Sequence, residues 1–111
     1  MDLGVEGKVA IITGGSDGIG RAAAERLSAE GAFVAIVART QSALDVTAKE
    51  IWAQTGNEVM GIAADVRSEE AVKAMVAKVA SKWGSIDILI NNAGTSSFAN
   101  FEDMTNDMVE E

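Results

Sequence analysis

A glycine-rich segment, residues 13–20, constrains the fold of this chain more than any other feature. It reads Thr-Gly-Gly-Ser-Asp-Gly-Ile-Gly, follows a short apolar run at residues 9–12 and precedes an alanine-rich stretch. A strand that ends in glycines and leads into a helix lets backbone N–H groups approach phosphate oxygens closely, and the helix N-terminus adds the positive end of its dipole. The segment therefore predicts a binding site for a diphosphate group.

The alternative is an ordinary strand-to-helix turn in which glycine supplies a positive φ. Gly14, Gly18 and Gly20 stand ahead of a helical Arg-Ala-Ala-Ala stretch. Three glycines at this spacing favour phosphate binding over a simple turn.

Short apolar runs alternate with segments of helical periodicity along the chain. The runs predict strands at residues 8–13, 33–38, 58–64 and 86–90, and the periodic segments predict helices at residues 18–30, 41–54 and 68–83. Nearly continuous apolar strands separated by helices are typical of a parallel sheet buried on both faces. We therefore expect an α/β fold with a doubly wound, Rossmann-type sheet in strand order 3-2-1-4, occupying residues 1–111 as one domain.

Apolar spacing also predicts which helix faces are buried. The expected inward residues share a helical repeat within each segment, and are Ile19, Ala23 and Leu27 in the first helix and Leu44, Ala48, Ile51 and Trp52 in the second. Trp83 is likewise expected in the core rather than as a stacking platform. Ser68 suits the N-cap of the third helix and Gly84 its end, whereas Thr105 is expected to cap a final helix.

Composition narrows the class of protein further. The chain has 111 residues, a net charge of −8 and neither cysteine nor histidine. The acidic balance argues against nucleic-acid binding, and the missing residue types exclude disulfides and make a zinc site improbable. No apolar stretch is long enough to span a bilayer and the acidic start is unlike a signal peptide, so we expect no membrane association and a cytoplasmic protein.

Three motifs in order resemble the short-chain dehydrogenases/reductases. The glycine spacing at Gly14, Gly18 and Gly20 matches that family, Asp65-Val66 after the third strand resembles its adenine-contacting pair, and residues 91–94 (Asn-Asn-Ala-Gly) resemble its signature tetrapeptide. The resemblance extends from Gly7 over essentially the whole chain. One glycine motif is weak support, but three motifs, each after the expected strand, are specific.

The resemblance implies a cofactor site where the carboxyl ends of the strands converge. Its candidate residues are Gly14, Gly15, Ser16, Asp17, Gly18, Ile19, Arg39, Asp65, Val66, Asn91, Ala93 and Gly94. By this resemblance, the backbone from Gly15 to Ile19 faces the ribose and phosphates, and Gly20 instead allows the helix to pack closely on the sheet. In relatives, the aspartate that matches Asp65 accepts a hydrogen bond from the adenine amino group. From spacing alone, Asp65 could equally be a turn residue or helix cap, and Asn91 with Asn92 could tie neighbouring strands.

Arg39 bears on which dinucleotide is bound. An acid near this position, about 20 residues past the glycines, binds the ribose hydroxyls in NAD-dependent Rossmann proteins. Here Ala38 and Arg39 stand at the end of the second strand, and a guanidinium can bind a phosphate dianion. We therefore expect NADP as cofactor. Asp17 in the glycine segment weakens this preference, because a carboxylate near phosphates is unfavourable, so NAD remains possible.

The catalytic groups implied by the resemblance are not found in the sequence. Relatives use a Tyr-x-x-x-Lys pair with a serine, but this chain contains no tyrosine. We therefore assign no catalytic residue and expect the cofactor-binding half of a longer oxidoreductase. Such a parent would transfer hydride between NADP and a small carbonyl or alcohol substrate, as a homo-oligomer like its relatives.

Two other classes compete with this interpretation. The chain could be a non-catalytic dinucleotide-binding module, which an in-frame Tyr-x-x-x-Lys beyond Glu111 would argue against. It could also be an adenosylmethionine-dependent methyltransferase, although that class favours an acid where Ala38 and Arg39 stand.

Overall fold

The computed structural model describes residues 4–14 and 18–92. In chain order the elements are β1 (Val9–Thr13), α1 (Gly18–Ala29), β2 (Phe33–Ala38), α2 (Gln41–Thr55), β3 (Val59–Ala63), α3 (Glu69–Trp83) and β4 (Ile88–Asn91). The four strands and three helices expected in this region are confirmed, with each boundary within about two residues, the usual ambiguity at element ends. The helix expected after Thr105 lies outside the described residues.

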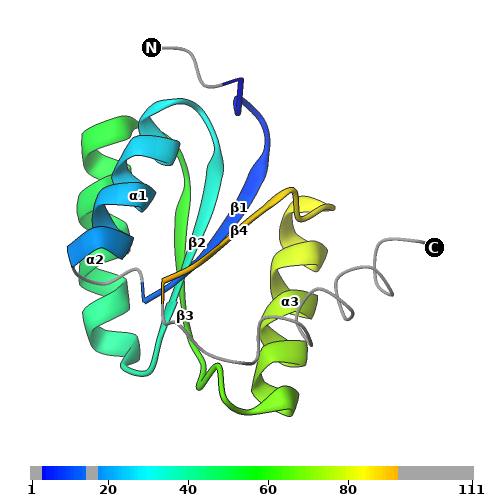
Figure 1. Cartoon of the computed structure of the whole chain (residues 1–111). Helices are drawn as coiled ribbons and strands as arrows, with labels where there is room; N and C mark the ends of the chain where they lie inside the picture. Colours follow the sequence, from blue (N-terminus) through cyan, green and yellow to red (C-terminus); the bar gives the residue numbers. More distant parts are fainter. Residues whose placement is uncertain (1–3, 15–17, 93–111) are drawn as a thin grey trace.

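The four strands form one parallel sheet in the order β3-β2-β1-β4, which confirms the predicted topology. Helices α1 and α2 cover one face of the sheet and α3 covers the other, as Figure 1 shows. The strand order changes direction between β1 and β4, so no crossover connection covers the carboxyl ends of these two strands. Among the described residues, no helix combines the length and apolar character needed to cross a membrane.

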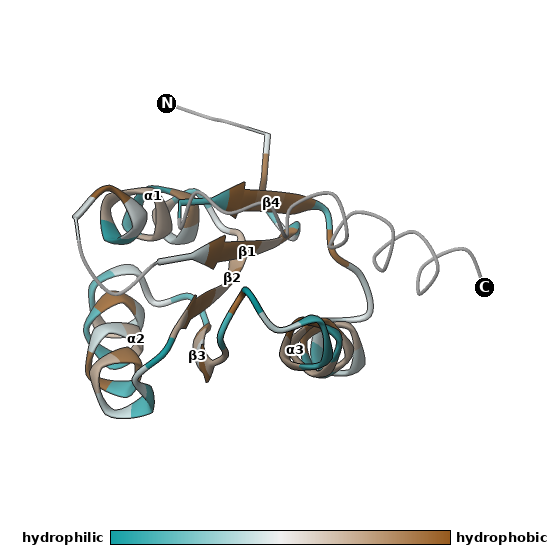
Figure 2. Ribbon diagram, turned by 60° about the horizontal axis from the view of Figure 1, so that its bottom comes forward, coloured by the Kyte–Doolittle hydropathy of each residue, from teal (hydrophilic) through white to brown (hydrophobic). Residues whose placement is uncertain are grey.

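Each strand contributes alternate side chains to two separate apolar layers, since successive residues of a strand point to opposite faces. On the α1 and α2 face the buried strand residues are Ala10, Ile12, Val34, Ile36 and Val59. On the α3 face they are Val9, Ile11, Ala35, Val37 and Ile62. In Figure 2 the strands form an apolar band between the helices. A sheet buried on both sides holds its strand ends, and thus the loops after them, in fixed positions.

The buried face of α1 differs from the prediction. Ile19 is 80% exposed rather than inward, and Gly20, Ala24, Leu27 and Ser28 are the buried residues. The glycine at position 20 allows the first turn to approach β1, so the position without a side chain faces the sheet. Apolar spacing assigns no weight to glycine and therefore selected Ile19.

The prediction for Trp52 on α2 is also wrong, since that side chain is 46% exposed. The buried stripe consists of Leu44, Thr47, Ala48 and Ile51. Trp52 follows Ile51 by about 100° around the helix and so lies beyond the stripe that meets the sheet.

Helix α3 has the expected ends. The Ser68 hydroxyl accepts a hydrogen bond from the Ala71 backbone N–H at 3.2 Å, and Gly84 ends the helix with a φ of +86°. Trp83, in the last turn, is half-buried and stacks on Phe33 with ring centroids 5.5 Å apart. Its indole N–H donates to the Glu58 carboxylate at 3.2 Å. Trp83 therefore packs against the amino-terminal end of the sheet, in the structural role expected for it.

Asp87 also stabilises this end of the sheet, through hydrogen bonds to β1. The backbone N–H of Val9 donates to the Asp87 carboxylate at 2.9 Å, and the Asp87 N–H donates to the Val9 carbonyl at the same distance. The side chain thus takes the place of a backbone acceptor at the start of the β1–β4 pairing. This fixes the register that brings Asn91 beside Thr13 at the opposite end.

Candidate functional site

A pocket of about 350 Å³ lies where β1, β2 and β3 end. Its described lining residues come from the end of β2 and from the loops that follow the three strands, and are Gly14, Val37, Ala38, Arg39, Ala64, Asp65, Val66 and Arg67. This is the carboxyl edge of the sheet, where open α/β folds bind their ligands. The structure therefore brings together four of the predicted site residues, namely Gly14, Arg39, Asp65 and Val66.

The turn after β1 is built around two glycines. Gly14 has a φ of +69°, a conformation that side chains disfavour, and its N–H donates to the Val37 carbonyl at 2.6 Å. A Cβ on Gly20 would lie 2.1 Å from the Gly14 carbonyl oxygen, far inside contact distance. The first turn of α1 therefore packs directly on the backbone at the end of β1. This directs the N-terminus of α1 toward the site.

The asparagines after β4 hold this turn from the other side. The Thr13 hydroxyl donates to the Asn91 side-chain oxygen at 2.9 Å, and the Asn92 amide donates to the Gly14 carbonyl at 3.3 Å. The strand-tying role considered for this pair is therefore observed. Both asparagines lie on the β1–β4 side, and Asn91 does not line the pocket described above.

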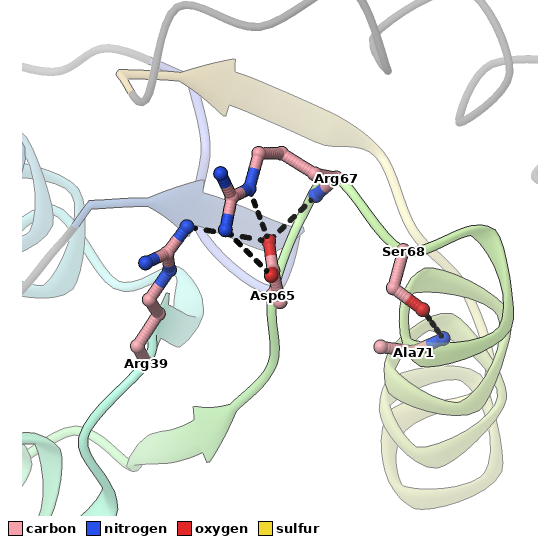
Figure 3. A network of polar contacts seen from close by, with 5 residues as sticks. All are labelled: Arg39, Asp65, Arg67, Ser68 and Ala71. Carbon is pink, nitrogen blue, oxygen red and sulfur yellow. Dashed lines mark hydrogen bonds and ion pairs between the residues drawn. The ribbon is translucent and has the colours of Figure 1, made fainter.

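Asp65 forms a turn directly after β3 and holds an arginine. One carboxylate oxygen accepts from the Arg67 backbone N–H at 2.9 Å and from Arg67 Nε at 3.1 Å, and the other accepts from a terminal nitrogen of Arg67 at 3.1 Å. The turn role left open by the sequence is therefore present. Figure 3 shows these contacts, with Arg39 approaching the same carboxylate from the loop after β2.

The charges around Asp65 change its titration. Hydrogen bonds from the Arg67 side chain and backbone lower the pKa of the Asp65 carboxyl from 3.8 to about 2, with a smaller contribution from the charge of Arg39. Asp65 in turn raises the pKa of the Arg67 guanidinium. The carboxylate is thus ionised at any pH at which the fold is expected to operate.

Arg39 is placed by the residue that starts the next helix. The Gln41 side chain donates to the Gly61 carbonyl and accepts from the Ala63 N–H, each at 3.0 Å, so it pairs with the outer edge of β3 like a strand. This fixes the short loop between β2 and α2 against β3. A terminal nitrogen of Arg39 lies 3.8 Å from the Asp65 carboxylate, an ion pair that is too long for a hydrogen bond.

The remaining predicted residues fall into two groups. Gly18 and Ile19 begin α1 and lie outside the described lining of the pocket. Gly15, Ser16, Asp17, Ala93 and Gly94 lie outside the described residues, so their predicted contacts remain predictions.

Sequence reasoning missed Arg67. Arg67 lines the pocket, and its side chain is as exposed as that of Arg39. A signal was available, since Arg67 follows Asp65 by two residues in a loop at the same sheet edge, in a chain where cations are scarce. Among the residues that the structure describes, no group of three or more acidic side chains is placed to hold a metal ion.

Known proteins are similar to this chain in both sequence and fold. The family model for short chain dehydrogenase matches residues 8–111. Sorbitol dehydrogenase of Cereibacter sphaeroides is 43% identical over 101 residues, which cover 91% of this chain and 38% of that protein. The chain spans about a third of the length of the curated relatives that it matches.

Two solved structures show the fold with cofactors. L-sorbose reductase from Gluconobacter frateurii, complexed with NADPH and L-sorbose, is 39% identical with a TM-score of 0.81, over 99% of this chain and 46% of that one. An NAD⁺-bound xylitol dehydrogenase is 37% identical with a TM-score of 0.71, over 76% of this chain and 32% of that one. With its three motifs on the expected strand ends and a family match over nearly its whole length, the chain belongs to the short-chain dehydrogenases.

Proposed function

We propose that this chain binds a nicotinamide dinucleotide, with NADP preferred, and holds its adenosine half in the pocket at the ends of β1–β3. The observation that carries the proposal is the placement of Arg39 beside that pocket, 3.8 Å from Asp65. No acid stands at the end of β2, where one would bind ribose hydroxyls and repel a 2′-phosphate.

The dimensions and chemistry of the pocket fit part of such a ligand. Its volume of about 350 Å³ is at the lower end for small-molecule pockets, which suits an adenosine moiety rather than a whole dinucleotide. Ala38, Ala64 and Val66 supply an apolar lining for a base, and the charged residues lie at the rim. The diphosphate would continue over Gly14 toward the N-terminus of α1.

For the whole protein we propose a carbonyl–alcohol oxidoreductase acting on a small substrate. The relatives whose names state a reaction are dehydrogenases and reductases. The nicotinamide supplies the hydride when it is bound. The chain has no tyrosine or histidine, so we propose that these 111 residues bind and orient the cofactor and do not transfer the proton.

The test compares NADPH and NADH binding to the chain and to its Arg39→Gln variant by calorimetry. Loss of one charged hydrogen-bond partner is expected to weaken NADPH binding by about tenfold or more, with little change for NADH. The fold should be unaffected, because the Arg39 side chain is 63% exposed. Equal effects on the two dinucleotides would contradict the assigned role of Arg39, and failure of the unmodified chain to bind either would contradict the proposed function.

A further inference from the structure

We propose that Arg67 is a second specificity-determining residue for the 2′-phosphate of the cofactor, acting together with Arg39 across the pocket. The inference rests on the proposed dinucleotide site. It concerns the residue after the Asp65-Val66 pair, which the sequence motifs do not single out.

The charge balance at the pocket depends on Arg67. The charged residues in its described lining are Arg39, Asp65 and Arg67. Asp65 offsets one of the two guanidinium charges, so one positive charge is in surplus on a chain whose net charge is −8. Without Arg67, the charges of Arg39 and Asp65 would cancel, and a phosphate dianion would meet a locally neutral rim beside a carboxylate. The surplus that attracts the phosphate therefore depends on Arg67.

The geometry of the pocket also favours a joint role for Arg39 and Arg67. Arg39 and Arg67 come from the loops after two adjacent strands, and Figure 3 shows both guanidinium groups pointing toward the Asp65 carboxylate. Their side chains are 63% and 65% exposed, so an incoming anion can reach both without displacing packed residues. Arg67 contacts Asp65 through Nε and one terminal nitrogen. Its other terminal nitrogen makes no hydrogen bond to the residues that the structure describes, so it can donate to a bound anion.

The loop that carries Arg67 is held by contacts that do not involve its side chain. The Arg67 backbone N–H donates to Asp65, and the Ser68 N–H donates to the Asp65 carbonyl at 2.9 Å, just before the cap of α3. Neither contact uses the side chain of position 67, so both can hold the turn whatever residue stands there. The guanidinium can turn from the carboxylate toward a phosphate while the loop keeps its shape. Asp65 would then have an oxygen available for a donor on the bound adenosine.

The experiment uses two probes that lack the nicotinamide, adenosine 2′,5′-bisphosphate and adenosine 5′-monophosphate, titrated into the full chain by calorimetry. In Arg67→Gln, we expect bisphosphate binding to weaken by about tenfold and monophosphate binding by less than about twofold. Arg26→Gln is the matched control, because it removes one exposed arginine from the far end of α1. That control should change neither affinity by more than about twofold.

Two outcomes would overturn the inference. An unchanged ratio of the two affinities in Arg67→Gln would mean that Arg67 does not bind the 2′-phosphate. A parallel loss of both affinities would mean that Arg67 only orients Asp65. If the unmodified chain binds neither probe, the proposed function itself fails along with the inference.

Ionic strength gives an independent readout. We expect the preference of the unmodified chain for the bisphosphate to decrease as salt rises, and to decrease less steeply in Arg67→Gln, because fewer charges are then screened. Identical salt dependence in the two proteins would also overturn the inference.

Discussion

The two ends of the sheet use similar residue types for different purposes. At the amino-terminal end, the Asp87 carboxylate accepts a backbone N–H, and Glu58 accepts from Trp83 and pairs with Lys82. At the carboxyl end, Asp65 instead holds two exposed arginines beside a pocket. A carboxylate that replaces a strand partner stabilises the fold, whereas one that balances exposed cations leaves them able to bind an anion.

The difference follows from parallel topology. Every strand enters the sheet at the amino-terminal end, so contacts there set the register of the strands. At the other end the chain leaves each strand for a helix, and the short loops diverge around the switch in strand order. We therefore expect substitutions at the amino-terminal end to lower stability without changing ligand preference, and those in the pocket to do the reverse.

A substitution at Gly20 should change both stability and ligand binding, and it has the largest expected effect. In Gly20→Ala the new methyl group would meet the Gly14 carbonyl, a backbone atom that cannot move without shifting β1 or α1. We expect destabilisation of about 1–3 kcal/mol or more, together with loss of dinucleotide binding. Urea unfolding and calorimetry measure the two effects.

The matched control for this prediction is Gly56→Ala. Gly56 has a positive φ, of +76°, but a Cβ added there would meet nothing within 4 Å beyond its own chain neighbours. We expect a cost of about 1 kcal/mol with unchanged binding. If Gly20→Ala were no more harmful than this control, the close approach of α1 to the glycine turn would be refuted.

Asp87→Ala tests the contribution of the amino-terminal end of the sheet. The Val9 N–H would lose its acceptor at a residue that is 1% exposed, which is expected to cost about 1–3 kcal/mol. The ratio of NADPH to NADH affinity should stay the same. Ser85→Ala is the control, because it removes only the hydroxyl bonded to Asp87 and should cost no more than about 0.5 kcal/mol. A changed affinity ratio in Asp87→Ala would argue that the two ends are coupled.

The smallest effect concerns the titration of Asp65. Because the pKa of this carboxyl is lowered from 3.8 to about 2 in the fold, its ionised form stabilises the fold above pH 3.8, and this contribution is lost as the pH falls through about 2. A carbon-detected NMR titration should therefore show Asp65 ionised down to pH 3. Arg67→Gln should raise the midpoint toward 3.8. A midpoint near 3.8 in the unmodified chain would disprove the Arg67 contact in solution.

Most of the fold was accessible from the sequence, because buried parallel strands leave long apolar runs and helices leave a 3.6-residue repeat. The strand order followed from the right-handed crossover rule. The buried faces of the helices were harder to predict, and the predictions for Ile19 and Trp52 were wrong. At Ile19 the deciding factor was the close approach of two backbones at Gly20, which the family resemblance implied but the apolar spacing does not encode. At Trp52 it was where the edge of the helix meets the sheet, which hydrophobicity does not encode either.

The site was predicted in part for a related reason. Gly14, Arg39, Asp65 and Val66 follow strands directly, so topology alone brings them to one edge. Arg67 was missed because its contribution depends on a turn that folds the side chain back onto Asp65. The hydrogen bonds of Gln41 to the edge of β3 join residues about 20 positions apart and leave no local pattern.

An amide-resolved NMR titration of the chain with NADPH shows directly whether the cofactor binds at the carboxyl ends of the strands. We expect saturable shifts at Gly14, Arg39, Ala64 and Arg67, with none at the amino-terminal positions Val9, Phe33 and Asp87. Shifts centred on the amino-terminal end, or none at saturating NADPH, would contradict the assignment of the cofactor site to the carboxyl ends of the strands.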